Sequence, residues 1–112
     1  MAPVLTPTLL DPIAETFELN ETELGRLFGV SRQAVGQWRE RGVPSSRKAK
    51  VATLAAIGDL LRHQLKRERI PGVARRPADA YGGRSMLEMI ERDRQDELQA
   101  EIRSSFDWGS TV

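Results

Sequence analysis

The sequence of 112 residues has no cysteine, a single histidine and few aromatic residues. The absence of cysteine excludes disulfides and thiolate metal sites, which fits a reducing compartment. The longest nearly apolar run, VATLAAIGDLL, is too short to span a bilayer and contains Asp59. The first ten residues also lack the basic residues that open a secretory signal. We therefore expect a cytoplasmic protein that does not associate with membranes.

Catalytic constellations are also missing. His63 lies in the middle of a predicted helix, and no cysteine can join it in a metal site or dyad, so we expect a solvated or partly packed residue. The carboxylates of residues 86–105 alternate with Arg92 and Arg94, as on an exposed helix face. The sequence YGG at residues 81–83 is too short to form a phosphate loop. These observations favour a binding protein without cofactor or metal over an enzyme.

The charge is distributed unevenly along the chain, although the formal net charge is only +1. Residues 1–42 contain four Lys/Arg and six Asp/Glu, residues 43–84 contain ten and three, and residues 85–112 contain three and seven. A basic middle followed by an acidic end indicates two surfaces with different partners. The alternative interpretation is a set of ordinary solvated helix faces.

Hydrophobic spacing and capping residues predict an all-α protein. A first helix is expected near residues 9–18. Asn20 followed by Glu23 forms a capping-box pattern for a second helix that ends at Gly29. Ser31 is the expected N-cap of a third helix, which Gly42 ends.

The second half of the chain continues the helical pattern. One long helix is expected from Ser45 to about Arg69, with an apolar stripe on one face, and Pro71 with Gly72 should break it. Residues 70–85 are interpreted as a linker or ordered loop. Ser85 then caps a last helix over residues 86–105. Its apolar residues Met86, Leu87, Met89 and Ile90 belong either to the core or to a dimer interface.

The stretch ETELGRLFGVSRQAVGQWRERG, residues 21–42, carries the strongest motif. Two short helices that cross at a sharp angle need a small residue at the crossing, here Gly25, and a turn residue that tolerates positive φ, here Gly29. Apolar contacts between the helices come from Leu24, Phe28, Val30, Val35 and Trp38. The pattern resembles the helix-turn-helix of phage-repressor and Xre-type regulators. Trp38 shares a face with Val35, which favours a core position over base stacking.

This resemblance makes residues 31–41 the recognition helix. Arg32 and Gln33 lie in its first turn, where side chains reach base edges in the major groove, and Gly36 and Gln37 follow one turn later. Ser31 and the free N–H groups at the helix start suit a phosphate. The remaining basic residues are predicted to neutralise phosphates: Arg39, Arg41, Arg47, Lys48 and Lys50. The alternative is an αα packing unit with no role in DNA binding.

The order of the later segments resembles a second, more specific family. A helix-turn-helix, one long helix, RRPADAYGGRSMLEMI, an acidic helix and a short aromatic tail are similar to the antitoxins of the Xre/MbcA/ParS type. The resemblance implies a type II toxin–antitoxin operon, whose usual toxin is a RES-domain protein that degrades NAD. It implies that the C-terminal segment covers the toxin's active-site cleft, while the helix-turn-helix represses the shared promoter.

The resemblance points to a toxin-binding set in the C-terminal segment, namely Tyr81, Arg84, Phe106, Asp107 and Trp108. Phe106 and Trp108 flank Asp107, so the rings are candidate anchors in pockets while the carboxylate meets an arginine. In the alternative, Phe106 continues the apolar stripe of residues 98 and 102, and Trp108 folds back onto it. An acidic segment complements a basic cleft that binds a dinucleotide phosphate.

The sequence thus predicts a helix-turn-helix DNA-binding domain that includes the long helix, residues 1–69. A small helical segment for toxin binding or dimerisation follows, residues 70–112. Expected partners are the cognate toxin, operator DNA and a second copy of the chain, since helix-turn-helix proteins commonly dimerise on two half-sites. The runner-up is a plain transcriptional repressor whose second half only dimerises. A pure interaction protein is the third alternative.

Overall fold

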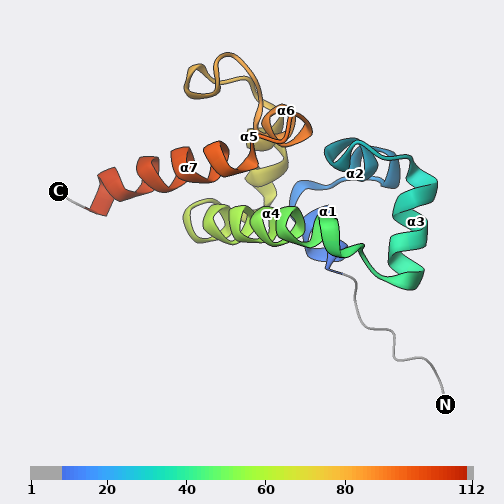
Figure 1. Cartoon of the computed structure of the whole chain (residues 1–112). Coiled ribbons are helices and arrows are strands. Elements are labelled where there is room, and N and C mark those ends of the chain that lie inside the picture. Colours follow the sequence, from blue (N-terminus) through green and yellow to red (C-terminus); the bar gives the residue numbers. More distant parts are fainter. Residues whose placement is uncertain (1–8, 111–112) are drawn as a thin grey trace.

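The computed structural model describes residues 9–110, without the side chains of residues 106–110, and this part of the chain consists of helices joined by turns and loops (Figure 1). Its only β-type pairing is an isolated bridge between Ala78 and Arg84. The all-α prediction is confirmed for these residues. None of their helices is long and apolar enough to cross a membrane. The elements are α1 (Leu10–Phe17), α2 (Glu21–Phe28), α3 (Arg32–Arg41), α4 (Ser45–Gln64), the 3₁₀ turn η1 (Arg67–Arg69), α5 (Ile70–Arg75), the 3₁₀ turn η2 (Asp79–Tyr81), α6 (Met86–Glu91) and α7 (Gln95–Ser110).

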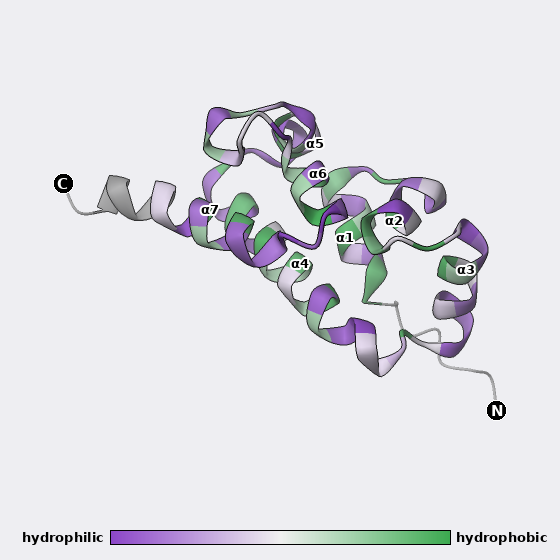
Figure 2. Ribbon diagram, turned by 45° about the horizontal axis from the view of Figure 1, so that its top comes forward, coloured by the Kyte–Doolittle hydropathy of each residue, from purple (hydrophilic) through white to green (hydrophobic). Residues whose placement is uncertain are grey.

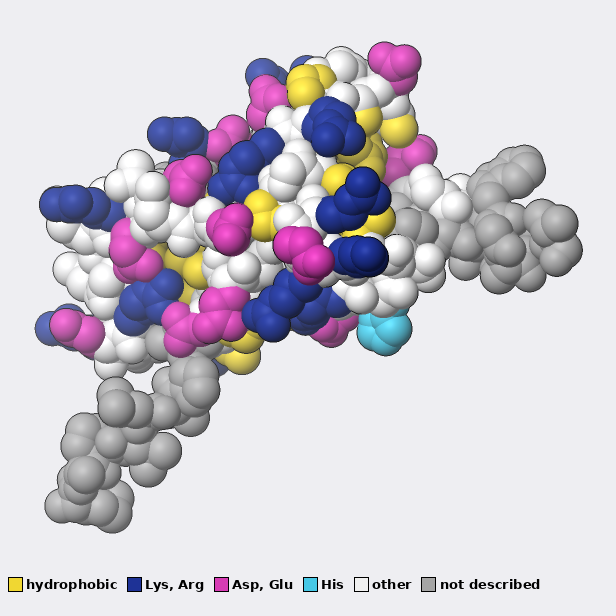
Figure 3. All heavy atoms as spheres, turned by 180° about the vertical axis from the view of Figure 1, so that it is seen from behind, with side chains coloured by type: hydrophobic (Ala, Val, Ile, Leu, Met, Phe, Trp, Pro, Cys, Tyr) yellow, Lys and Arg dark blue, Asp and Glu magenta, His cyan; other side chains and the backbone are white. Residues whose placement is uncertain are grey.

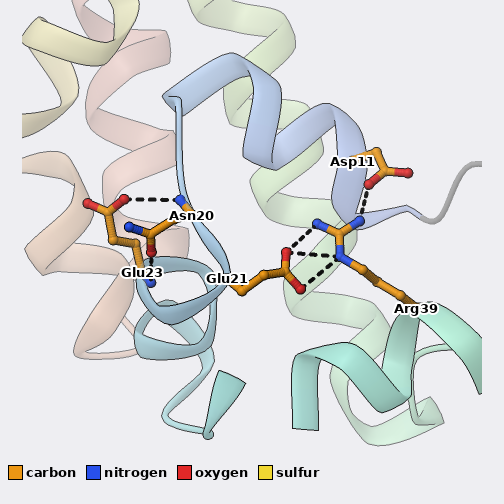
Figure 4. A network of polar contacts seen from close by, with 5 residues as sticks. All are labelled: Asp11, Asn20, Glu21, Glu23 and Arg39. Carbon is orange, nitrogen blue, oxygen red and sulfur yellow. Dashed lines mark hydrogen bonds and ion pairs between the residues drawn. The ribbon is translucent and has the colours of Figure 1, made fainter. Parts of the chain in front are cut away.

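The three helix starts predicted from capping residues are confirmed. The Asn20 side chain accepts a hydrogen bond from the Glu23 amide at 2.8 Å, and the Glu23 carboxylate accepts one from the Asn20 amide at 3.0 Å (Figure 4). Ser31 caps α3, and Ser85 forms a second capping box, with Glu88. These hydrogen bonds from Ser85 lower the pKa of the Glu88 carboxyl. Each cap satisfies amide groups that a helix leaves without an internal partner.

The long helix ends five residues earlier than predicted. α4 stops at Gln64 because Leu65 is extended, and the chain turns through η1 before Ile70. Pro71, which was expected to break a helix, lies instead in the first turn of α5. A proline is tolerated there because the first amides of a helix have no intrahelical acceptor. The prediction of a linker or ordered loop over residues 70–85 is therefore wrong for residues 70–75, which form α5.

The single helix predicted over residues 86–105 is also wrong, because two helices occupy this segment. α6 ends at Glu91, and Asp93 adopts a left-handed conformation with φ of 58° before α7 begins. Lys50 of α4 holds this break, since its ammonium group donates to the Ile90 carbonyl at 2.9 Å and to the Asp93 carboxylate at 2.6 Å. The interruption thus depends on a residue about forty positions away in the chain.

One hydrophobic core joins the two halves of the chain. α7 lies along α4, and α5 and α6 pack against α1 and α2 (Figure 1). Hydrophobic residues gather where these helices meet, as the green segments in Figure 2 show. The boundary expected between residues 69 and 70 falls inside this core, beside the fully buried Ile70. Buried residues from both sides form it: Leu10, Ile13, Phe17, Leu24, Leu27, Leu54, Ile57 and Leu61 with Ile70, Ala74, Met86, Met89, Ile90, Leu98 and Ile102.

Candidate functional sites

The turn between α2 and α3 depends on two glycines. A Cβ at Gly25 would lie only 2.6 Å from the Val30 carbonyl oxygen. The turn at Val30 can therefore pack this closely against α2 only because residue 25 has no side chain. Gly29 has a φ of +68° and ends α2, a conformation that glycine adopts without steric cost. Val35 and Trp38 of α3 are buried, and the Trp38 ring meets the Phe28 ring edge-on, with 5.5 Å between centroids. Trp38 is therefore a core residue, as predicted.

The opposite face of α3 is open to solvent. Arg32, Gln33 and Gln37 are exposed, and their side chains make no hydrogen bond or ion pair within the described part of the chain. A Cβ at Gly36 would meet no atom within 4 Å. Ser31 is exposed, and its hydroxyl accepts a hydrogen bond from the Ala34 amide at 3.2 Å. The helix α3, which carries the predicted base-reading residues, lies at the end of the molecule opposite the C-terminal end of α7 (Figure 1).

Arg39 does not belong to this open surface. Its guanidinium group pairs with Asp11 of α1 and with Glu21 of α2, at 2.8 Å from the Glu21 carboxylate (Figure 4). The hydrogen bond with Glu21 is the main cause that raises the pKa of Arg39, although burial opposes it. Arg39 therefore fixes α3 against α1 and α2, and we remove it from the residues expected to neutralise phosphates.

Arg47 and Lys50 are likewise engaged inside the protein. Arg47 donates to the Phe28 carbonyl at 2.8 Å, and its guanidinium carbon lies 5.9 Å from the centre of the Trp38 ring. The Lys50 side chain is only 9% exposed and lies 5.5 Å from the centre of the Phe28 ring, in addition to its bonds with α6 and Asp93. A cation in such contacts would have to break them to reach DNA. Both residues stabilise the packing of α4 on α2 and α6.

Arg41 and Lys48 remain as exposed cations of the predicted phosphate-binding set. Both line a surface hollow of about 460 Å³ at the C-terminal end of α3, together with Trp38, Glu40 and the residues around Gly42. Leu9 and Arg39 also line this hollow, which does not include the exposed residues Arg32, Gln33 and Gln37. After Arg39, Arg47 and Lys50 are set aside, seven of the ten predicted DNA-contacting residues remain candidates: Ser31, Arg32, Gln33, Gly36, Gln37, Arg41 and Lys48.

A second hollow lies in the C-terminal half of the molecule, between the turn at residues 80–84 and α7. It has a volume of about 520 Å³ and brings together Tyr81 and Arg84, both of which the toxin-binding set contains. Burial raises the pKa of the Tyr81 phenol, and the nearby Glu101 carboxylate adds to this effect. Among the described residues, the lining consists of Ala80, Tyr81, Gly82, Arg84, Met89, Arg94, Glu97, Ala100, Glu101 and Ser104.

The remaining predicted toxin-binding residues, Phe106, Asp107 and Trp108, have side chains outside the described residues. The backbone of α7 continues through them to Ser110. Just before them, Leu98 and Ile102 are buried in the core. The choice between a core position and a partner contact for Phe106 therefore stays open.

Two further expectations, for the apolar residues of α6 and for His63, are tested by burial. Met86, Met89 and Ile90 are buried, which confirms their core interpretation, and Leu87 is half-buried. His63 is exposed on α4, with its Nδ1 2.7 Å from the Asp59 carbonyl oxygen. Within residues 9–110 no group of three or more His, Cys, Asp or Glu residues is placed to hold a metal ion.

On the face of the molecule shown in Figure 3, Lys/Arg and Asp/Glu side chains alternate over most of the surface.

The hollow beside α7 also contains residues that the sequence did not single out. Arg94, Glu97 and Glu101 approach Tyr81 only because the chain turns back at residues 78–84. Spacing along the sequence carries no signal for this approach.

No family model, curated protein or solved structure matches the chain. The resemblances to known families thus rest on the sequence motifs, and the candidate sites rest on the geometry described above.

Proposed function

We propose that the protein is a sequence-specific DNA-binding protein, in which α2, the turn and α3 form an Xre-type helix-turn-helix. The observation that carries this proposal is the uncovered face of α3, on which Arg32, Gln33 and Gln37 stand without internal partners. Arg pairs well with guanine and Gln with adenine in the major groove. The ion pairs of Arg39 with Asp11 and Glu21 fix α3 against α1 and α2. Its exposed side chains are therefore presented on a rigid element.

The base-reading role is tested with DNA from upstream of the protein's own gene. We expect the double variant Arg32→Ala, Gln33→Ala to bind this DNA at least about tenfold more weakly, because each good base contact contributes ~1–3 kcal/mol of discrimination. The matched control is Gln64→Ala, Arg69→Ala, which removes the same residue types from exposed positions at the far end of α4 and in η1. Wild-type affinity and sequence preference in the first variant would exclude base reading by α3.

We further propose that the protein is the antitoxin of a type II toxin–antitoxin operon, which represses its own promoter and neutralises a toxin, of RES-domain type. The sequence resemblance suggests this role, and the arrangement of the helices supports it. The exposed face of α3 and the C-terminal end of α7 lie at opposite ends of the molecule (Figure 1). DNA and a partner protein would therefore not compete for the same surface.

Co-expression with the adjacent gene tests the antitoxin role. The full chain should restore growth to cells that express this gene's product, whereas a chain that ends at Arg103 should not. The shortened chain retains Leu98 and Ile102, the buried residues of α7, so it should still bind the upstream DNA. If the full chain also fails to restore growth, the plain repressor becomes the better interpretation. If the shortened chain restores growth fully, residues 104–112 are not the neutralising element.

A further inference from the structure

The hollow beside α7 has two walls that the fold holds in place. One wall is the turn at residues 78–84, closed by hydrogen bonds from the Ala78 amide to the Arg84 carbonyl at 3.1 Å and from the Gly83 amide to the Ala78 carbonyl at 3.0 Å. The other wall is the face of α7 that carries Glu97, Glu101 and Ser104. Leu98 and Ile102, on the other side of this helix, are buried and fix its rotation. The hollow is therefore already formed in the isolated chain.

The charges in the hollow are only partly compensated. Arg94 and Glu97 pair with each other at 2.6 Å, so neither needs an outside partner. Arg84 and Glu101 form no ion pair within the described part of the chain, although they lie on opposite walls of the same hollow. The Glu101 carboxylate acts electrostatically on the Tyr81 phenol, whose pKa it helps to raise. Arg84 also acts electrostatically on the Glu88 carboxylate, whose pKa it helps to lower. One wall thus carries a positive charge and the other a negative charge, and neither has an ion-pair partner among the described residues.

This charge pattern selects the class of ligand. A nucleic acid would meet Arg84 favourably but would be repelled by Glu101, because its backbone is uniformly negative. A protein segment carries both signs and can place a basic side chain against Glu101 and a carboxylate against Arg84. Apart from these charges and the Arg94–Glu97 pair, the lining is largely uncharged and includes Ala80, Gly82 and Ala100 together with the Tyr81 ring and the buried Met89. Such a surface suits a contact whose rim is polar and whose centre is not.

We propose that this hollow is a docking site for a segment of the toxin, with an arginine or lysine opposite Glu101 and an aspartate or glutamate opposite Arg84. This inference rests on the proposed antitoxin function and adds a second contact to the aromatic tail. Ser104, one of the lining residues, precedes the tail residues Phe106, Asp107 and Trp108 by two to four positions on α7. A toxin held by the tail would thus lie next to the hollow.

The test uses the full chain and the purified product of the adjacent gene, with the dissociation constant measured by calorimetry. Glu101→Arg should weaken binding at least about tenfold, since it converts an attraction into a repulsion at a preformed contact. Arg84→Glu should have a similar effect. Asp96→Arg is the matched control, because it makes the same charge change at an exposed position of α7 outside the hollow. The control should change the dissociation constant less than twofold.

Other outcomes contradict specific parts of the proposal. Equal binding by wild type, Glu101→Arg and Asp96→Arg would exclude the hollow as a docking site. Equal weakening by Glu101→Arg and Asp96→Arg would also exclude it, because long-range charge would then explain the effect. If the wild-type chain itself does not bind the adjacent gene's product, the antitoxin function fails and this inference fails with it. Thermal melting and binding to upstream DNA should be unchanged in all three variants, which excludes misfolding as the cause.

Discussion

Two helical glycines, Gly25 and Gly36, occupy opposite environments in the α2–α3 unit. Gly25 is buried, and the space that a Cβ would need is occupied by the Val30 carbonyl. Gly36 lies in the middle of α3, where nothing within 4 Å would meet a Cβ. Glycine in a helix interior destabilises the helix by roughly 0.5–1 kcal/mol relative to alanine. Gly25 offsets this cost by permitting close packing, whereas no contact inside the protein requires a glycine at position 36.

The same substitution at these two positions should therefore have opposite effects on stability. We expect Gly25→Ala to lower the free energy of unfolding by ~1–3 kcal/mol, as overpacking does. Gly36→Ala should raise it by roughly 0.5–1 kcal/mol, the helix-propensity gain. If α3 enters a DNA groove as proposed, Gly36→Ala should nevertheless weaken binding to the upstream DNA. Urea denaturation and DNA titration measure the two effects, and unchanged DNA affinity in Gly36→Ala would contradict a close approach at this position.

At the scale of the helices, the basic residues near α3 divide into two functional groups. Arg39 joins three elements, because its guanidinium group bonds with Asp11 and Glu21 while its backbone belongs to α3 (Figure 4). Lys48 is exposed near the start of α4 and borders the hollow at the end of α3. We infer that Arg39 orients α3 and that Lys48 contacts a phosphate if α3 binds DNA as proposed. Stability and salt dependence distinguish these roles.

Methionine at each position removes the charge while it keeps much of the side-chain length. Arg39→Met should lower the free energy of unfolding by ~1–3 kcal/mol, because the charged hydrogen bonds of the guanidinium group with the Asp11 and Glu21 carboxylates are lost. It should leave the slope of log K against log salt concentration unchanged. Lys48→Met should leave stability within ~0.5 kcal/mol and reduce that slope by about one, as expected for one phosphate contact. A reduced slope in Arg39→Met would return Arg39 to the phosphate-binding set.

At the scale of the molecule, local sequence signals predicted three helix starts. Long-range contacts determine the break between α6 and α7 and the positions of the basic side chains, which the sequence did not predict. The caps at Asn20, Ser31 and Ser85 depend on residues three positions away, so spacing along the chain was sufficient to find them. The break at Asp93 depends on Lys50 of α4, and no local pattern contains it. The exposed face of α3 was predictable, because it follows from the spacing of residues along one helix. The internal positions of Arg39, Arg47 and Lys50 were not, because a basic residue's spacing does not reveal its partner.

Because residues 1–69 and 70–112 share one core, we expect that the first segment does not fold stably without the second. A chain ending at Arg69 would contain the whole of α1–α4, yet it would lack Ile70, Ala74, Met89 and Leu98, which fill the core beside Phe17 and Leu54. Loss of several buried side chains costs ~2–5 kcal/mol for each, whereas the total stability of a domain is about 5–15 kcal/mol. The shortened chain should therefore not unfold cooperatively.

Circular dichroism during urea denaturation measures this directly. The full chain should show one transition, with an m value that matches the exposure of a single core. Residues 1–69 alone should show a broad, non-cooperative loss of helix and should bind the upstream DNA much more weakly, although every proposed DNA contact is present in them. A sharp transition and full DNA affinity in the shortened chain would instead establish residues 1–69 as an independent domain. The orientation of α3 would then not require the C-terminal helices at all.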